Sequence, residues 1–142
     1  MFNLFKNFFD YNQREINRLR KKVEEINLLE DKTRNLKDGD FIVGEIDGKV
    51  VASGALKKVR NGIAELKRMR VHPDFQSRGF GQAILDELEK RAKRLGFKKI
   101  VLDTSKGWIK AQKFYKKNGY IEIGRNKLNK RYNAIFYEKE LV

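Results

Sequence analysis

Two tight turns constrain the arrangement of three strands in the first half of this chain. Asp47-Gly48 separates a β-branched run at 41–46 from a second run at 49–56. Because glycine accepts the positive φ of a type I′ turn, this dipeptide predicts a two-residue hairpin. A second turn at Asn61-Gly62 leads into a third run at 63–71. The three segments therefore predict an antiparallel meander.

Helical and strand patterns alternate over the rest of the 142 residues. Residues 12–35 have helical spacing, with apolar Ile16, Leu19, Val23 and Ile26 on one side and Arg14, Arg18, Arg20, Lys21 and Lys22 on the other. We expect this basic helix to pack on its own domain rather than on a membrane or nucleic acid. Further helices are expected at 81–95 and 109–118, ended by Gly96 and Gly119, and further strands at 99–103, 120–123 and 132–140.

This order of elements predicts the fold class. Strands and helices that alternate in this way form a mixed α/β fold with a central, mostly antiparallel sheet flanked by helices. We expect a single domain over residues 1–142, whose N-terminal helical part is 1–37.

The residue types that are scarce in the chain exclude several kinds of site. There is no cysteine, so a disulfide, a thiolate metal site and a cysteine nucleophile are excluded. His72 is the single histidine, which argues against a Ser-His-Asp hydrolase and against a zinc enzyme. We interpret His72, beside Pro73, as a turn residue rather than a base, and we expect no metal.

The formal net charge of +14 predicts a positive surface potential that attracts anions. A nucleic acid, an acidic protein or membrane surface, or a phosphate-rich cofactor would each account for it, as would a solvated lysine-rich surface. Residues 1–9 are interrupted by polar side chains, unlike a signal peptide, and no later stretch approaches the ~20 apolar residues of a membrane span. We therefore expect a soluble, cytoplasmic protein.

The segment from Arg70 to Ala83 is the most informative for function. A strand ends and a helix begins there, across a loop that contains Gly79 and Gly81. Glycines let the backbone approach a ligand closely, and the start of the helix offers unpaired N–H groups and a partial positive charge. The loop is therefore a candidate anion site. A Rossmann site would need a third glycine where Ile84 stands.

The same segment resembles the coenzyme A signature of the GNAT family of N-acetyltransferases. The resemblance rests on a strand, Val-x-Pro at 71–73, Gln-x-x-Gly-x-Gly at 76–81 and the long amphipathic helix that follows. It implies that the amides of 78–83 hold the pyrophosphate of acetyl-coenzyme A and that residues 69–71 pair with its pantetheine arm. A second block, 111–120, is similar to the family's Ala-x-x-Phe-Tyr-x-x-x-Gly-Phe.

The resemblance implies a set of site residues and a reaction. The expected cofactor-binding residues are Met69, Arg70, Val71, Gln76, Arg78, Gly79, Phe80, Gly81, Gln82, Ala83, Trp108 and Ala111. The expected reaction is transfer of an acetyl group from acetyl-coenzyme A to an amine by direct attack. At Trp108 many family members have an asparagine that touches the cofactor, so Trp108 either replaces that contact with its indole face or packs in the core or at the rim.

Two residues are expected to catalyse the reaction. Glu65 stands where some family members carry a general base, and the alternative is a surface carboxylate paired with a lysine. Tyr115 matches the tyrosine that protonates the coenzyme A sulfur in many members, and the alternative is a core aromatic. We expect the adjacent Phe114 to be the core residue of the two.

Two alternatives to an enzyme stay open: a non-catalytic module that binds coenzyme A, and a basic module that binds nucleic acid. The acceptor amine is not identified by the sequence. The oligomeric state is also open, with a dimer among the options.

Overall fold

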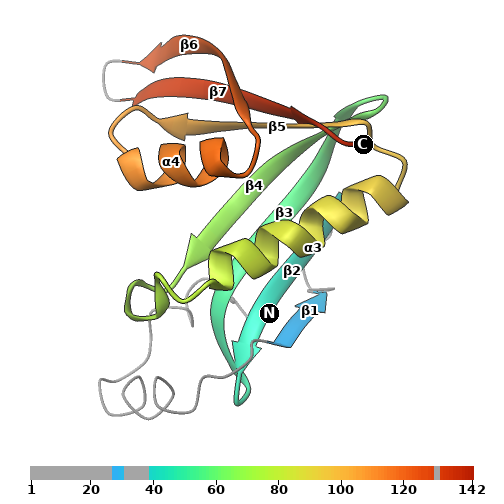
Figure 1. Ribbon diagram of the computed structural model, residues 1–142, viewed down its shortest axis with the longest axis vertical. Coiled ribbons are helices and arrows are strands. Elements are labelled where there is room, and N and C mark those ends of the chain that lie inside the picture. Colours follow the sequence, from blue (N-terminus) through green and yellow to red (C-terminus); the bar gives the residue numbers. More distant parts are fainter. Residues whose placement is uncertain (1–26, 31–38, 130–131) are drawn as a thin grey trace.

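The computed structural model describes residues 27–30, 39–129 and 132–142 (Figure 1). Its elements are β1 (Asn27–Glu30), β2 (Gly39–Ile46), β3 (Lys49–Arg60), β4 (Ile63–Val71), the 3₁₀ turn η1 (Pro73–Phe75), α3 (Phe80–Arg94), β5 (Lys99–Ser105), α4 (Ile109–Lys117), β6 (Ile121–Asn129) and β7 (Tyr132–Glu140). The strands form one seven-stranded sheet in the order β1-β2-β3-β4-β5-β7-β6. The predicted mixed α/β fold is confirmed.

The predicted meander is present as β2, β3 and β4. Asp47 and Gly48 have φ of 48° and 77°, the two positive values that a type I′ turn requires. β4 has the predicted bounds, and β3 continues four residues beyond its predicted end at Leu56, as far as Arg60. The hairpin dipeptides therefore determined which strands are neighbours.

The helix predicted at 12–35 is wrong for part of its length. Residues Asn27–Glu30 form β1, which pairs antiparallel with Glu45 to Ile42 of β2. The apolar stripe that suggested a helix ends at Ile26. Beyond it, pairing with the open edge of β2 outweighs the local helix propensity of the residues. The rest of the predicted helix, 12–26 and 31–35, lies outside the described residues.

β4 and β5 are the parallel pair of the described sheet, and they separate soon after they meet. Only Ile63 to Glu65 of β4 pair with Lys99 to Val101 of β5. Beyond that point β4 continues to Val71 and β5 to Ser105, and Figure 1 shows the two strands diverging. We call this divergence of β4 and β5 the fork. β2–β4 with α3 lie on one side of this fork, and β5–β7 with α4 lie on the other.

The helix α3 packs against the meander through a continuous apolar side. Ile84, Leu85 and Leu88 are fully buried in the main core. Two ion pairs in the C-terminal half of α3 add to this packing: Arg91 Nη1 lies 2.9 Å from Asp40 of β2, and Lys139 Nζ of β7 lies 2.7 Å from Glu89. α3 is thus held to both parts of the sheet. Neither described helix combines the length and apolar character needed to cross a bilayer.

Replacing Gly54 by alanine should destabilise the fold. A Cβ on Gly54 would lie 2.5 Å from Ile84 Cγ2, 2.7 Å from Leu88 Cδ1 and 2.7 Å from Met69 Sδ, so α3 would have to move off the sheet. Overpacking of this kind costs about 1–3 kcal/mol. We expect Gly54→Ala to lower the thermal midpoint by several degrees in calorimetry. Gly124→Ala, where a Cβ meets nothing within 4 Å, is the control and should leave the midpoint nearly unchanged.

Candidate acetyl-transfer site

The start of α3 presents unpaired amides toward the fork. Gly79 is the N-cap residue, with the left-handed φ of 84° that glycine tolerates, and no side chain caps this end in the described part of the chain. The first turn of α3 carries no acidic residue. The amides of Phe80, Gly81 and Gln82 precede the first intrahelical bond, from Ala83 N to Gly79 O at 3.0 Å. This end of the helix is suited to an anion.

The connection from β4 to α3 is held by short hydrogen bonds. Gln76 Nε2 donates to Val71 O at 3.3 Å, and His72 N donates to Val51 O at 2.8 Å. The His72 ring is buried, its Nδ1 accepts from Asp74 N at 3.2 Å, and burial lowers its pKa. These contacts fit His72 as a turn residue. Gln76 lies in the predicted position, and its side chain holds the end of β4.

A β-bulge reshapes β4 before it reaches the loop. The register with β3 shifts between Ser53 and Ala55, Arg68 has φ 55°, and Ser53 Oγ donates to Arg68 O at 2.9 Å. After Glu65, no strand of the described chain pairs with the side of β4 that faces β5. This edge of β4, which runs on to Val71, is therefore not covered by another described strand, and an extended ligand can lie along it.

The helix α4 forms the other wall of the site. A Cβ on Gly81 would lie 3.4 Å from Val71 Cγ2 and 3.9 Å from Phe114 Cζ, so the end of β4, the start of α3 and α4 converge. Gln82 Nε2 donates to Asn118 Oδ1 at 2.6 Å, and Asn118 Nδ2 donates back to Gln82 Oε1 at 3.1 Å. The Gln82 side chain therefore ties α3 to α4, a role that its place in the motif did not indicate.

The burial of the two neighbouring aromatic residues on α4 differs from the expectation. Tyr115 is buried, at 8% exposure, whereas Phe114 is only partly buried and packs against the edge of the core. The prediction that Phe114 is the core residue of the two is wrong, because the inward side of the short α4 falls on Tyr115. Burial raises the pKa of the Tyr115 hydroxyl to about 12. The hydroxyl is therefore protonated, and able to donate, throughout the neutral and mildly alkaline range.

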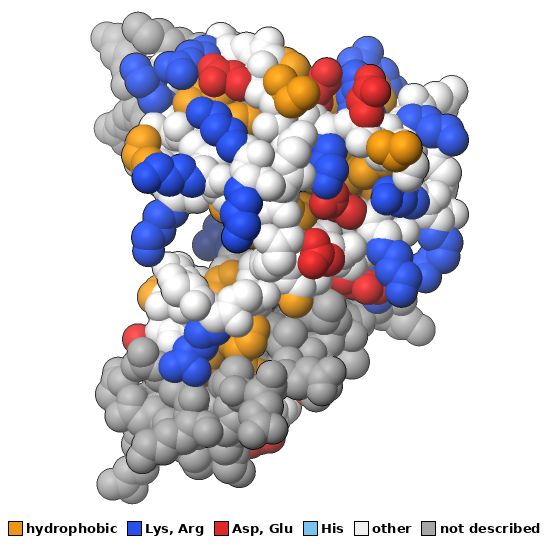
Figure 2. Space-filling model, in the orientation of Figure 1, with side chains coloured by type: hydrophobic (Ala, Val, Ile, Leu, Met, Phe, Trp, Pro, Cys, Tyr) orange, Lys and Arg blue, Asp and Glu red, His pale blue; other side chains and the backbone are white. Residues whose placement is uncertain are grey.

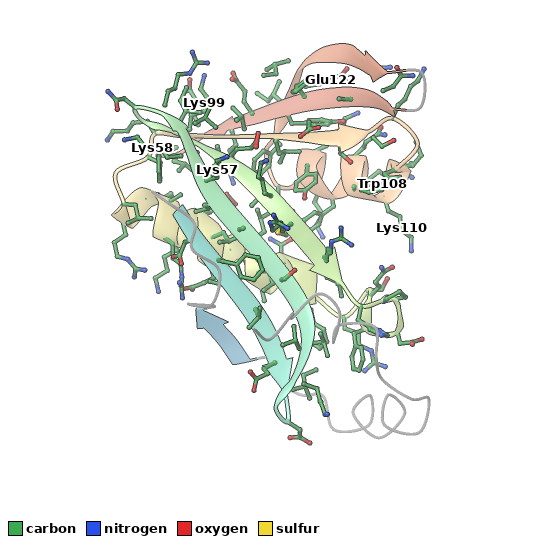
Figure 3. The ribbon with its side chains drawn as sticks, turned by 180° about the vertical axis from the view of Figure 1, so that it is seen from behind. Lys57, Lys58, Lys99, Trp108, Lys110 and Glu122 are labelled. Atoms are coloured by element: carbon green, nitrogen blue, oxygen red, sulfur yellow. The ribbon has the colours of Figure 1, made fainter. Side chains whose placement is uncertain are left out.

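Trp108 is the N-cap residue of α4 and is 64% exposed, so it does not pack in the core. Figure 3 shows Trp108 and Lys110 at the end of α4 that lies on the same side of the molecule as the β4–α3 connection. Gln112 Nε2 fixes the preceding loop by donating to Ser105 O at 3.2 Å and to Lys106 O at 2.7 Å. No feature of the sequence pattern singled out Gln112 for this positioning role.

Glu65 lies where β4 and β5 separate. It is the last residue of β4 that pairs with β5, opposite Val101. Its carboxylate is 27% exposed and lies 3.1 Å from Lys67 Nζ, so the pairing with a lysine that the alternative interpretation required is present. Figure 2 shows the surface hollowed between the β4–α3 connection and α4, with Lys and Arg side chains around the opening. Glu65 thus places a carboxylate where the fork begins, the start of α3 places uncapped amides beyond the end of β4, and α4 carries the neutral phenol of Tyr115.

A family model described as acetyltransferase (GNAT) family matches residues 4–120. The chain belongs to this family. The match includes much of the N-terminal segment, which contains neither of the two blocks that carry the resemblance.

The chain is similar to three named proteins. It is 31% identical over 68 residues to an amino-acid acetyltransferase of Mannheimia succiniciproducens, covering 47% of this chain and 16% of that protein. It is 29% identical over 103 residues to an IAA acetyltransferase of Azospirillum brasilense, covering 72% of this chain and 67% of that protein. A GNAT acetyltransferase of Elizabethkingia anophelis, solved with acetyl-CoA bound, has TM-score 0.75 and 16% identity, covering 84% and 100% of the two chains, and shows the shared fold. The chain spans about a sixth of the first relative.

Proposed function

We propose that the protein is an N-acetyltransferase that uses acetyl-coenzyme A as acyl donor and an amine as acceptor. The observation that carries this proposal is the fork: an edge of β4 that no described strand covers leads to the uncapped amides at the start of α3. A pyrophosphate accepts hydrogen bonds from such amides, and an extended amide-containing arm can pair with such an edge. The residues present therefore fit acetyl-coenzyme A, which supplies the activated acetyl thioester.

The proposed residue roles follow from the chemistry of the transfer. The ammonium group first gives one proton to Glu65 and becomes a neutral amine. Its nitrogen then forms a bond to the acetyl carbon, the carbon–sulfur bond breaks, and the nitrogen loses a second proton to solvent while the sulfur gains one. Glu65 accepts the proton of the ammonium group, directly or through water, because it lies where β4 and β5 separate. Tyr115 donates its hydroxyl proton toward the departing sulfur, since burial keeps that hydroxyl neutral.

The further cofactor contacts are assigned from position. Met69, Arg70 and Val71 border the pantetheine arm from β4, and Trp108 and Ala111 border it from α4. Arg78 and the amides of Phe80, Gly81 and Gln82 surround the pyrophosphate, while the Ala83 amide is already bonded to Gly79 O. A cytoplasmic location and a single domain over 1–142 stay predictions of the sequence.

The relatives guide the choice of acceptors to test. Those relatives are an amino-acid acetyltransferase and an IAA acetyltransferase, so small molecules come before proteins. Acetyl-coenzyme A should bind saturably in calorimetry, and mass spectrometry should detect acetyl transfer to at least one amine of a panel of amino acids, polyamines, aminoglycosides and peptides. Binding without any transfer would favour the non-catalytic module. Binding of heparin or nucleic acid, with none of acetyl-coenzyme A, would favour the nucleic-acid module.

Glu65→Gln tests the general base. If Glu65 accepts the amine's proton, the mutant should lose roughly 10²-fold in turnover near neutral pH. The loss should shrink as pH rises, because a growing fraction of the amine, with a pKa near 10 if it is lysine-like, arrives already neutral. If Glu65 only attracts the ammonium group, KM rises and turnover stays nearly intact.

The matched control for this measurement is Glu138→Gln. Glu138 is a half-exposed carboxylate of β7 paired with Lys99 at 3.0 Å, in the same kind of ion pair as Glu65. The Glu138→Gln variant should leave the pH–rate profile unchanged. A Glu65→Gln profile identical to that of the wild type in shape and height would remove Glu65 from the mechanism.

A further inference from the structure

Two lysines lie next to Glu65 on one face of the sheet. Lys57 of β3 is directly opposite Glu65 in the antiparallel register, and Lys67 is two residues further along β4. Directly opposite residues have Cβ atoms about 4.5–5.5 Å apart, and residues i and i+2 of a strand share a face. The intervening Ala64 and Leu66 are buried in the core that packs against α3. Glu65, Lys57 and Lys67 therefore share the face away from α3.

Figure 3 shows this face of the sheet, with α3 behind it and Lys57 labelled over β3 and β4. Lys57 and Lys67 are both exposed, and Glu65 is half-buried. The carboxylates that share the face on the strands beyond the fork are Asp103 of β5 and Glu138 and Glu140 of β7, and Glu138 is paired with Lys99. The β3–β4 wall beside the candidate base is thus cationic, while the base and Asp103 supply negative charge at the fork.

The ion pair between Lys67 and Glu65 can exchange its partners. The lysine side chain is 45% exposed and the carboxylate 27% exposed, and pairs this open to solvent contribute little to stability. A ligand with both an ammonium group and a carboxylate satisfies both members at once: its ammonium replaces Lys67 at Glu65, and its carboxylate replaces Glu65 at Lys67. Lys57, across the strand, adds a second cation for the same carboxylate.

We propose that the acceptor is an amine with a carboxylate on a nearby carbon, such as an α- or β-amino acid. This inference rests on the proposed acetyl transfer and adds the substrate class. Glu65 receives the ammonium group and takes its proton, while Lys57 and Lys67 hold the carboxylate and so fix which nitrogen meets the acetyl carbon. The transferred atoms and protons are those of the reaction already given. A polyamine has no group for these two lysines and is repelled by them.

Matched pairs of acceptors test the proposal. L-leucine with L-leucinamide, and β-alanine with β-alaninamide, differ only in the carboxylate, and release of the coenzyme A thiol is followed for each at a fixed concentration of neutral amine. We expect kcat/KM for each acid to exceed that for its amide by roughly tenfold or more, the usual size of a contact to a charged group. The fixed neutral-amine concentration corrects for the different fractions of acid and amide that are unprotonated at the assay pH.

Variants of the lysines separate this inference from the proposed function. Lys57→Gln should raise KM for the acids roughly tenfold with kcat nearly unchanged, and leave the amides unaffected. Lys67→Gln should do the same to KM and, because it also frees Glu65, shift the pH profile. Lys58→Gln is the matched control: Lys58 is the next residue of β3, lies opposite the buried Ala64, and lines a hollow with Leu95 and Gly96 at the far end of α3. Lys58→Gln should change neither KM nor kcat.

Each outcome decides one of the two claims. Equal rates for acids and amides, transfer only to acceptors without a carboxylate, or a Lys57→Gln enzyme with unchanged KM would overturn the carboxylate proposal and leave the acetyltransferase standing. Failure of the wild type to bind acetyl-coenzyme A would overturn the proposed function itself. Acid-selective transfer that Lys57→Gln weakens and Lys58→Gln preserves would support both.

Discussion

Gly79→Val should abolish binding of acetyl-coenzyme A while the domain stays folded. Gly79 is the N-cap residue of α3, and a Cβ there would meet no protein atom within 4 Å, so the new side chain projects into open space beside the uncapped amides. A pyrophosphate that can no longer reach two of these amides loses two charge-assisted hydrogen bonds, each worth about 1.5–3 kcal/mol. We therefore expect the dissociation constant to rise by about 100-fold or more in calorimetry.

The control for this variant lies at the other end of the same helix. Gly96 has φ 89°, close to the 84° of Gly79, and a Cβ there also meets nothing within 4 Å. Gly96→Val therefore carries the same backbone strain, about 1–2 kcal/mol for a left-handed conformation, without touching the site. Both variants should lose similar stability, and only Gly79→Val should lose binding. Equal affinities in the two variants would place the pyrophosphate elsewhere.

The sequence predicted the parts of the fold that have local signals. The Asp47-Gly48 turn gave the hairpin and its turn type, and Gly96 and Gly119, both with φ 89°, follow the ends of the two helices as expected. β1 was missed because its pairing with β2 depends on partners distant in the sequence. The far half of β6, to Asn129, was missed although its partners on β7 are close in the sequence. Their own residues show no clear alternation.

The site residues that belong to a sequence motif could be predicted, whereas those whose position depends on side-chain packing could not. The loop from Gln76 to Ala83 and the Phe-Tyr block follow patterns of consecutive residues, so their grouping at the fork was expected. The bulge at Arg68 was not, because a non-glycine residue with φ 55° leaves no mark in the sequence. The same holds for the Gln82–Asn118 pair, which joins residues 36 positions apart, and for the burial of Tyr115 in place of Phe114.

Tyr115→Phe should lower turnover by roughly 10²–10⁴-fold with little change in the affinity for acetyl-coenzyme A. The ring contacts of Tyr115, including the edge contact with Tyr120 at 5.6 Å between centroids, survive the change, and only the hydroxyl is lost. The departing sulfur then lacks its proton donor, and the effect falls on the chemical step. Single-turnover measurement with a confirmed acceptor isolates that step from product release.

The pH dependence of this effect distinguishes Tyr115 from Glu65. Because burial raises the pKa of Tyr115 to about 12, its hydroxyl stays protonated from neutral pH to at least pH 10. The ratio of wild-type to Tyr115→Phe turnover should therefore stay constant over that range, whereas a tyrosine of ordinary pKa near 10 would begin to lose its proton and its advantage there. Tyr120→Phe is the control, since it removes a neighbouring buried hydroxyl that has no partner among the described residues and should leave turnover unchanged. If Tyr115→Phe and Tyr120→Phe turn over equally fast, Tyr115 is a packing residue and the sulfur takes its proton from water.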